Sequence, residues 1–277
     1  MKNVMALVDC DSFFCSCEKI FRPDLKKKPV IVLSNNDGCV ISRNREAKSL
    51  GIQMGVPYFK VKSFCQKHKV AIFSSNFSLY TEVSKRIINI LKTFSSNVEV
   101  YSIDEAFIDL TGVSNPHQFS LEIKKTVEQF TKVPVSIGVA PTKGLTKAAC
   151  FIAKKDLSFN GVVSLLTQED QKEALKQMPI NKLWGVSKGR EARLIFMGIK
   201  TALDFRDFEN QALIKKTLTK VGLQIQDELR GVSCFPIGET QQKKKEVMSS
   251  RSFGKPVYDL KTLREIAANH AHEVAEE

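Results

Sequence analysis

Three carboxylates stand where apolar, strand-like stretches end or meet. Residues 4–8, Val-Met-Ala-Leu-Val, predict a buried strand that ends at Asp9. Asp104 and Glu105 lie between two more such stretches. If the three strands are neighbours in one sheet, all three carboxylates meet at one end of it. Mg²⁺ prefers oxygen ligands, and two ions roughly 4 Å apart can activate an attacking oxygen and stabilise a leaving one.

An acidic turn in solvent is the simpler interpretation of Asp104 and Glu105 taken alone, because acidic turns are common. Asp9 favours the metal site, since a lone carboxylate at the end of a buried strand has no structural use. The three acids together therefore predict a site for two Mg²⁺ ions.

Basic side chains that could bind phosphate recur on two predicted helices. The helix at 42–50 carries Arg43, Arg45 and Lys48, and the helix at 143–155 carries Lys143, Lys147 and Lys154. Lys147 and Lys154 are seven residues apart and therefore share a face. Arginine can fork onto phosphate oxygens, whereas lysine acts as a point charge. For either helix alone, a solvated basic face is the simpler interpretation.

A glycine-containing turn predicts a second kind of phosphate contact. Residues 180–188, Ile-Asn-Lys-Leu-Trp-Gly-Val-Ser-Lys, are followed by Met-Gly-Ile, a pattern that resembles a helix-hairpin-helix. In such a motif the turn, here Gly185, Val186, Ser187 and Lys188, holds a DNA phosphate without reading sequence. Ser187 stands where a second glycine is usual, and a plain helical hairpin is the alternative.

The elements that must position these residues follow from the apolar pattern. Strands are predicted at 4–8, 30–33, 98–103, 106–110, 133–139 and 161–165, and helices at 42–50, 77–94, 117–131 and 143–155. Without residues 10–75, the order is strand, helix, strand, strand, helix, strand, with one added helix and strand. That order predicts an α+β fold with a ferredoxin-like sheet, its helices on one face, and an insertion after the first strand.

Beyond the sheet, residues 168–235 lack strand patterning and predict a small helical domain. The run Gln-Gln-Lys-Lys-Lys at 241–245 is typical of a linker. A strand-like piece at 247–253 and a helix at 260–276 complete the predicted elements.

Length and charge suggest the class of protein. The 277 residues favour about two domains, and 42 Lys and Arg against 30 Asp and Glu leave a net charge of +12. Such an excess favours a polyanionic partner, of which nucleic acid is the commonest. The alternative is a protein that is merely basic.

Cysteine spacing and hydropathy exclude other classes. The seven cysteines are odd in number and include no Cys-x-x-Cys pair, which argues against a disulfide framework and against a zinc site. No apolar run reaches the roughly 18 residues of a membrane span. The N-terminus lacks a signal-peptide layout, so we expect a cytoplasmic protein with no membrane partner.

Five motifs together resemble one family. Residues 8–18, Val-Asp-Cys-Asp-Ser-Phe-Phe-Cys-Ser-Cys-Glu, are similar to the first motif of the Y-family DNA polymerases, and 102–107, Ser-Ile-Asp-Glu-Ala-Phe, to their second acidic motif. Residues 21–25, 33–40 and 249–254 resemble the UmuC branch, the catalytic subunit of bacterial DNA polymerase V and its plasmid or phage relatives. The match runs along nearly the whole chain in unbroken order.

The resemblance implies a palm that holds the metals, fingers over the incoming nucleotide, a helical thumb on the duplex minor groove and a linker to a little finger. The expected bounds are 1–10 and 75–165 for the palm, 11–74 for the fingers, 166–235 for the thumb, 236–246 for the linker and 247–277 for a partial little finger. Relatives of the UmuC branch run well past this end, so we expect a little finger that is truncated.

The resemblance also assigns roles around the metals. Asp9, Asp104 and Glu105 match the catalytic metal ligands, and the backbone carbonyl of Cys10 matches a further ligand. These four positions all fall within the two acidic motifs.

Further roles concern the nucleotide. Phe14 falls at the steric gate that excludes ribonucleotides, and Phe13 is expected to pack beneath the nucleotide. Lys48 and Lys154 match triphosphate contacts. Arg45 stands where several relatives place a tyrosine on the triphosphate.

The function implied is template-directed, error-prone DNA synthesis past lesions in the DNA damage (SOS) response. A primer 3′-hydroxyl would attack the α-phosphate of a dNTP with the help of two Mg²⁺ ions. Primer–template DNA and dNTP are the expected partners, with the UmuD′ dimer, RecA and the sliding clamp implied by the resemblance alone. Two alternatives stay open: a non-catalytic DNA-binding module, which would not need the three acids together, and a palm-type nucleotidyl cyclase, which would not need the thumb.

Overall fold

The computed structural model describes residues 3–238, 247–250, 253 and 255–276. Contacts within the chain divide it into two compact units. The first unit is Met1–Ile20 with Ser78–Glu239, and the second is Phe21–Phe77 with Thr240–Glu277. All four predicted metal ligands belong to the first unit.

A five-stranded sheet forms the centre of the described part of the first unit. Its strands lie side by side in the order β5-β6-β1-β7-β8. Strand β1 pairs antiparallel with β6 and β7, and β7 pairs parallel with β8. The ferredoxin-like order predicted from the sequence is confirmed, with β8 as the added strand. The bounds are β1 (Met5–Cys10), β5 (Val98–Val100), β6 (Glu105–Asp109), β7 (Val135–Ala140) and β8 (Val162–Ser164).

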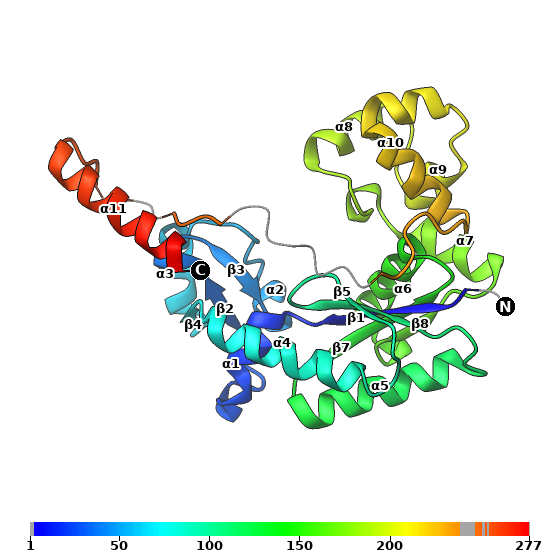
Figure 1. Cartoon of the computed structure of the whole chain (residues 1–277), viewed down its shortest axis with the longest axis horizontal. Coiled ribbons are helices and arrows are strands. Elements are labelled where there is room, and N and C mark those ends of the chain that lie inside the picture. Colours follow the sequence, from blue (N-terminus) through cyan, green and yellow to red (C-terminus); the bar gives the residue numbers. More distant parts are fainter. Residues whose placement is uncertain (1–2, 239–246, 251–252, 254, 277) are drawn as a thin grey trace. The chain divides into compact units, whose positions relative to one another are not determined.

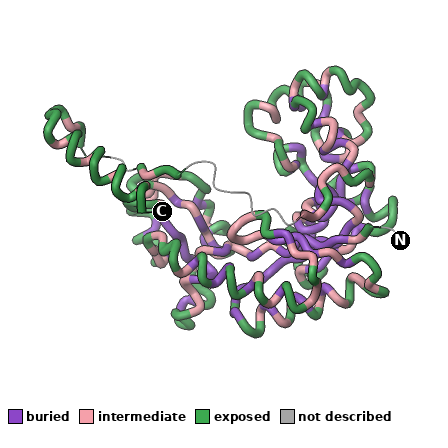
Figure 2. The backbone as a smooth tube through the Cα atoms, in the orientation of Figure 1, coloured by how far each residue is buried: buried purple, intermediate pink, exposed green. Residues whose placement is uncertain are grey.

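Helices cover both faces of this sheet, so the prediction of helices on one face is wrong for the added helix, α6 (Lys143–Lys155). Helices α4 (Phe77–Leu91) and α5 (Pro116–Thr131) lie on one side, and α6 lies on the other (Figure 1). Every residue of β7 is buried as a result, and the central strands are drawn as buried in Figure 2. Such strands carry continuous apolar runs, because neither face meets water.

Sequence signals at the helix ends fix where two of these helices begin. The side chain of Asn115 accepts a hydrogen bond from the amide of Gln118, and Pro116 occupies the first turn of α5. The Thr142 hydroxyl accepts one from the amide of Leu145 at the start of α6.

Helix α6 packs unusually close to the sheet at Gly138 of β7. A Cβ atom at this position would clash with the carbonyl oxygen of Thr146 and the amide nitrogen of Cys150, both in the backbone of α6. The missing side chain therefore sets the height of α6 above the strands.

The rest of the first unit is helical, as predicted for residues 168–235. Its core is continuous with that of α6 and β8 and includes Leu175, Leu194, Phe205 and Ile225. The elements are α7 (Gln168–Gln177), the 3₁₀ helix η4 (Ile180–Lys182), α8 (Lys188–Phe196), α9 (Ala202–Asp207) and α10 (Gln211–Leu229).

A buried carboxylate ties this helical part to the sheet. Glu228 of α10 is fully buried and accepts hydrogen bonds from the amides of Gly144 (2.8 Å), Cys234 (2.6 Å) and Phe235 (3.0 Å). Gly144 lies in the first turn of α6, where unpaired amides and the helix dipole favour a negative charge.

A buried ion pair lies beside it. The Lys143 ammonium is 2.6 and 2.7 Å from the two carboxylate oxygens of Glu99, and both side chains are at most 10% exposed. The amide of Gly238 donates a further hydrogen bond to Glu99 (2.8 Å). Lys143 was one of the predicted phosphate-binding candidates, and that interpretation is wrong because its ammonium is enclosed and already paired.

The second unit contains a smaller sheet. Its strands lie in the order β3-β2-β4, with β2 parallel to β4 and antiparallel to β3. The elements of the second unit are η1 (Pro23–Leu25), β2 (Val30–Leu33), η2 (Asn35–Asp37), β3 (Val40–Arg43), α2 (Arg45–Ser49), α3 (Tyr58–Lys67), β4 (Ala71–Ser74) and α11 (Leu260–Glu276). Two helices of the first unit remain: α1 (Phe13–Ile20) and η3 (Leu157–Phe159).

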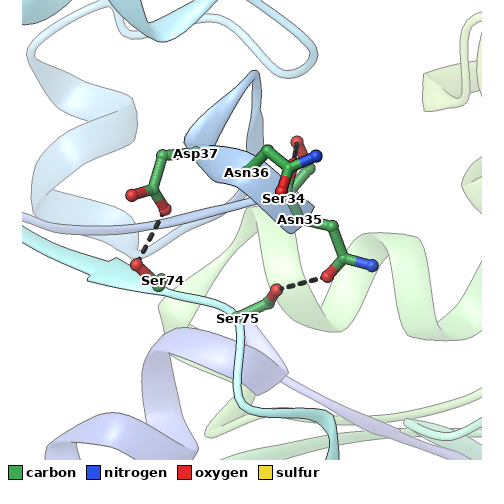
Figure 3. Close-up of a pocket in the computed structure, with 6 residues that line it drawn as sticks. All are labelled: Ser34, Asn35, Asn36, Asp37, Ser74 and Ser75. Atoms are coloured by element: carbon green, nitrogen blue, oxygen red, sulfur yellow. Dashed lines mark hydrogen bonds between the residues drawn. The ribbon is translucent and has the colours of Figure 1, made fainter. Parts of the chain in front are cut away.

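A polar cavity of about 310 Å³ opens where β2 and β4 end (Figure 3). The Ser74 hydroxyl donates to Asp37 (2.8 Å) and the Ser75 hydroxyl to Asn35 (3.1 Å). These bonds hold the turn after β2 against the end of β4.

Two predicted elements of the second unit are wrong in part. The helix expected at 42–50 begins only at Arg45, because Asn44 caps it by accepting from the amide of Ala47 (3.0 Å) while Arg43 still belongs to β3. No strand forms at 247–250 or at 253 among the described residues of the stretch 247–253. Most of the predicted linker, from residue 239 on, lies outside the described residues.

No helix in the described part of the chain has both the length and the apolar character needed to cross a membrane.

The Glu99–Lys143 pair leads to a stability prediction. We expect Lys143→Met to lower the free energy of unfolding by about 3–5 kcal/mol, because it leaves a buried carboxylate without its counterion. The double variant Glu99→Gln with Lys143→Met should recover most of that loss, since the neutral amide side chain can still accept from the amide of Gly238. Urea unfolding followed by the fluorescence of Trp184 measures both, and a loss below about 1 kcal/mol in the single variant would contradict the prediction.

Candidate active site

Asp9 and Glu105 face each other across neighbouring strands. The register pairs Asp9 of β1 with Glu105 of β6, and the amide of Cys10 donates to the carbonyl of Asp104 (2.9 Å). Hydrogen-bonded and non-hydrogen-bonded pairs alternate along antiparallel strands, so Asp9 and Glu105 form the closer kind of pair, with Cα atoms about 4.5 Å apart. Both carboxylates therefore leave the same face of the sheet at the same end.

Asp9 is a largely buried carboxylate that is paired with a lysine. Its side chain is 15% exposed, and Oδ1 lies 2.5 Å from Nζ of Lys154 on α6. Burial raises the pKa of Asp9 to about 7, although the charge and hydrogen bond of Lys154 act to lower it. Burial also acts to lower the pKa of Lys154, but the neighbouring Asp9 outweighs it and the pKa of Lys154 lies above its ordinary value.

Glu105 is paired in the same way with the other lysine on this face of α6. Both carboxylate oxygens of Glu105 lie near Nζ of Lys147, at 3.0 and 3.1 Å. The sequence placed Lys147 and Lys154 on one face, and the structure confirms this, because each lysine reaches one of the two facing carboxylates.

Two further acids complete the strand end. The Ser102 hydroxyl donates to Oδ1 of Asp104 at 2.6 Å, and this bond closes the turn between β5 and β6. Asp11 follows β1 and accepts from the Ser136 hydroxyl at 2.9 and 3.1 Å, while Lys154 lies 3.8 Å away. Four carboxylates thus lie at this strand end, and three of them, Asp9, Asp11 and Glu105, are within 4 Å of Lys147 or Lys154.

The chemistry of this donor set fits a divalent cation. Within the described residues, no group of three or more His, Cys, Asp or Glu side chains is placed to hold a metal ion, and Asp9 and Glu105 are instead paired with lysines. The oxygen ligands, their common end of the sheet and the repulsion of Asp9 by Glu105 and Asp104 nevertheless suit a hard cation, which would take the place of the lysines. Cys10 lies opposite Asp104 in the register, and its carbonyl as a ligand stays a prediction.

Phe14 is held by a buried aromatic side chain. Its ring stacks on that of Tyr80 of α4, with centroids 4.5 Å apart and planes at 17°. Tyr80 is fully buried, and its hydroxyl donates to Glu18 of α1 at 2.8 Å. Phe13 is also buried, and Phe14 is only partly exposed. The Phe14 ring therefore has a fixed orientation next to the strand that carries Asp9.

The predicted DNA-binding turn begins at a position where the backbone conformation favours glycine. Gly185 adopts a φ of 82°, a conformation that other residues rarely take. A Cβ there would also lie 2.9 Å from Ile225 Cδ1, and Arg190 donates to the Gly185 carbonyl at 2.9 Å. Lys188 begins α8, but the element before the turn is the 3₁₀ helix η4, not the α-helix that a helix-hairpin-helix implies. Val186 and Ser187 lie in the turn itself.

Arg45 and Lys48 lie in the second unit. Both belong to the short helix α2, one turn apart on the helix, so they share a face. Their predicted roles in triphosphate binding stay predictions, as do those of Phe13 and Phe14.

Sequence reasoning missed several residues of this site. Asp11 follows Asp9 by two positions in the same motif, which was a usable signal. The sequence carried no comparable signal for Tyr80 and Glu18, because a tyrosine on a predicted apolar helix face is typical of a core residue. Their joint position next to Phe14 depends on the packing of α1 against α4.

Comparison with known proteins adds independent information. The impB/mucB/samB family matches residues 8–151. Protein UmuC of Salmonella typhimurium strain LT2 is 43% identical over 277 residues, and protein ImpB of Salmonella typhimurium is 41% identical over 279. Each match covers 99% of this chain but 65% of the relative, so the chain spans slightly less than two thirds of their length.

A solved structure has a similar fold. The insertion ternary complex of Dbh DNA polymerase matches with a TM-score of 0.73 and 27% sequence identity. The match covers 84% of this chain and 69% of that structure.

The Asp9–Lys154 pair leads to a titration prediction. The pKa of Asp9 is about 7, above its ordinary value of 3.8, so the protonated form of Asp9 favours the folded state. Its contribution to the free energy of unfolding is therefore fully present below pH 3.8 and is lost as the pH rises through 7. We expect Lys154→Met to raise the pKa of Asp9 further, because burial remains while the attraction is removed. Carboxyl NMR titration in metal-free buffer measures it, with Lys155→Met as the control of equal charge. A pKa of Asp9 near 4 in the parent protein or in Lys154→Met would contradict the raised pKa.

Proposed function

Because the chain belongs to the impB/mucB/samB family, we propose that it carries the catalytic core of a template-directed, error-prone DNA polymerase. The observation that carries this proposal is the pairing of Asp9 and Glu105 at one end of a buried sheet, with Asp104 beside them. Similarity to UmuC and to a DNA polymerase in ternary complex supports the same reaction, and synthesis past lesions in the SOS response is the process in which we place it.

In this proposal Asp9, Asp104 and Glu105 hold two Mg²⁺ ions, with the carbonyl of Cys10 as a further ligand. Bound there, the ions would supply Lewis acidity to the primer hydroxyl and to the leaving pyrophosphate. Lys154, released from Asp9, would bind a triphosphate oxygen, since its ammonium is already at the strand end.

For the second unit, we propose from the resemblance alone that α2 binds the triphosphate. Arg45 and Lys48 present two positive charges one turn apart, a spacing that suits adjacent phosphates. The basic side chains would hold the triphosphate in line with the attacking hydroxyl, because phosphoryl transfer depends mostly on positioning and charge.

DNA would be held by the helical part of the first unit. The turn from Gly185 to Lys188 offers backbone amides and a lysine, which contact phosphates without reading sequence. Primer–template DNA is therefore the expected macromolecular substrate, and binding to UmuD′, RecA or the sliding clamp is proposed from the similarity to UmuC only.

The metal ligands are tested first. We expect Asp104→Ala to reduce nucleotide addition by several orders of magnitude while duplex binding changes little, because the ion geometry is lost but the phosphate contacts remain. Primer extension with Mg²⁺ and dNTPs measures the first property and fluorescence anisotropy of labelled duplex the second. A variant that keeps more than about a tenth of the parent activity would refute the assignment. The same assay separates a polymerase from a nucleotidyl cyclase and from a non-catalytic DNA-binding module.

Phe14 gives a test of substrate choice. As a gate, its ring would collide with a ribose 2′-hydroxyl, so Phe14→Ala should raise CTP relative to dCTP incorporation opposite template G by tenfold or more, about 1.4 kcal/mol in transition-state binding. As a core residue only, its loss would cost about 3–5 kcal/mol of stability and reduce both activities alike. The ratio of kcat/KM for the two nucleotides distinguishes these outcomes. An unchanged ratio would show that Phe14 is a core residue and not a gate.

A further inference from the structure

The ammonium of Lys147 lies between a carboxylate and three aromatic rings. Its Nζ is 3.0 and 3.1 Å from the oxygens of Glu105. It also lies 4.4 Å from the ring centroid of Tyr101, 5.8 Å from Trp184 and 5.9 Å from Phe107. All three distances fall within the roughly 6 Å over which a ring face attracts a cation. We call these three rings the aromatic cage.

The aromatic cage is built from two parts of the first unit. Phe107 follows Glu105 by two residues on β6 and so lies on the same face of the sheet. Tyr101 is tied to Glu105 because its amide donates to the Glu105 carbonyl (3.0 Å). Trp184 comes from the helical part, in the turn before α8, and its ring packs edge-on against Tyr101 (6.0 Å).

A cation that touches two partners at once can keep one of them when it loses the other. The Lys147 side chain is 16% exposed and that of Glu105 is 20%, so little water is available to replace a lost partner. If a divalent ion binds Glu105, the ammonium is repelled from that carboxylate, and the aromatic cage is the favourable environment that remains within reach. The attraction to the rings becomes stronger once no carboxylate offsets the positive charge.

We propose that Lys147 is a built-in placeholder for the metal ion at Glu105. While the ion is absent, its ammonium neutralises Glu105 and holds it in place against the repulsion of the neighbouring acids. When an ion binds, Lys147 leaves Glu105 and keeps the aromatic cage as its remaining partner, and Glu105 is ready in its binding orientation. This role rests on the proposed function, in which Glu105 is a metal ligand, and makes Lys147 a positioning residue.

The placeholder gives the two partners of Lys147 opposite effects on metal binding. Lys147→Met removes a competing cation, so Mn²⁺ should bind more tightly, by about threefold or more. Tyr101→Leu removes the nearest ring and leaves Lys147 a poorer alternative, so Mn²⁺ should bind about threefold more weakly. In the background of Lys147→Met, Tyr101→Leu should have no effect, because no ammonium remains to occupy the cage.

Mn²⁺ binding to the metal-free full chain, measured by electron paramagnetic resonance, tests this without any assay of activity. Lys125→Met, which removes an exposed positive charge from α5, is the matched control and should leave the affinity unchanged. Lys147→Arg keeps a cation and should stay close to the parent. Tyr101 is 39% exposed, so its replacement leaves the core intact.

Trp184 supplies a second readout, since it is the one tryptophan of the chain. Added Mg²⁺ should change its emission in the parent, as the ammonium approaches the indole, and should leave it unchanged in Lys147→Met.

The outcomes separate the two proposals. If Glu105→Gln does not weaken Mn²⁺ binding, Glu105 is no ligand, and the metal site falls together with the placeholder. If Glu105→Gln and Lys147→Met both weaken Mn²⁺ binding, Glu105 remains a metal ligand, but Lys147 only orients it and does not compete with the metal ion. A Tyr101→Leu effect that persists without Lys147 also refutes the placeholder role.

Discussion

The register of β1 between β6 and β7 is the constraint on which the site depends. Side chains alternate between the faces of a strand, so a shift of one residue would turn Asp9 to the opposite face and move it away from Glu105. The buried apolar residues of β1 resist such a shift, because it would exchange the residues that pack against α6 for those that pack against α4 and α5. Core packing, and not an interaction between the acids, therefore keeps the two carboxylates opposite each other.

Helix α6 supplies the charges that make this arrangement tolerable. Its lysines at positions 143, 147 and 154 each meet a carboxylate of the sheet: Glu99, Glu105 and Asp9. Like charges gathered at one strand end repel, and burial adds to the cost of ionising Asp9. One helix thus stabilises both a buried ion pair at Glu99 and the two facing acids at the strand end.

Local patterns in the sequence were sufficient for the palm-like sheet and its acids. The apolar runs located β1, β6 and β7, and the order of elements led to the ferredoxin-like topology. Helix α2 was placed too early because the apolar pattern does not reveal that Asn44 also accepts from Val30, 14 residues away. Likewise, the partners of Lys143, Lys147 and Tyr80 are distant in sequence, so spacing alone predicted a basic face or a core residue where the fold makes specific pairs.

Gly138 affects the geometry of the site although it lies outside the residues that could contact a substrate. The absent side chain lets the backbone of α6 come close to β7, and the lysines of α6 contact the carboxylates from that position. Any larger residue would raise the whole helix and lengthen the Lys147–Glu105 and Lys154–Asp9 contacts together. In an evolving lineage, position 138 would consequently be as intolerant of change as the acids themselves, and even alanine there would act on charge spacing through the shape of the backbone.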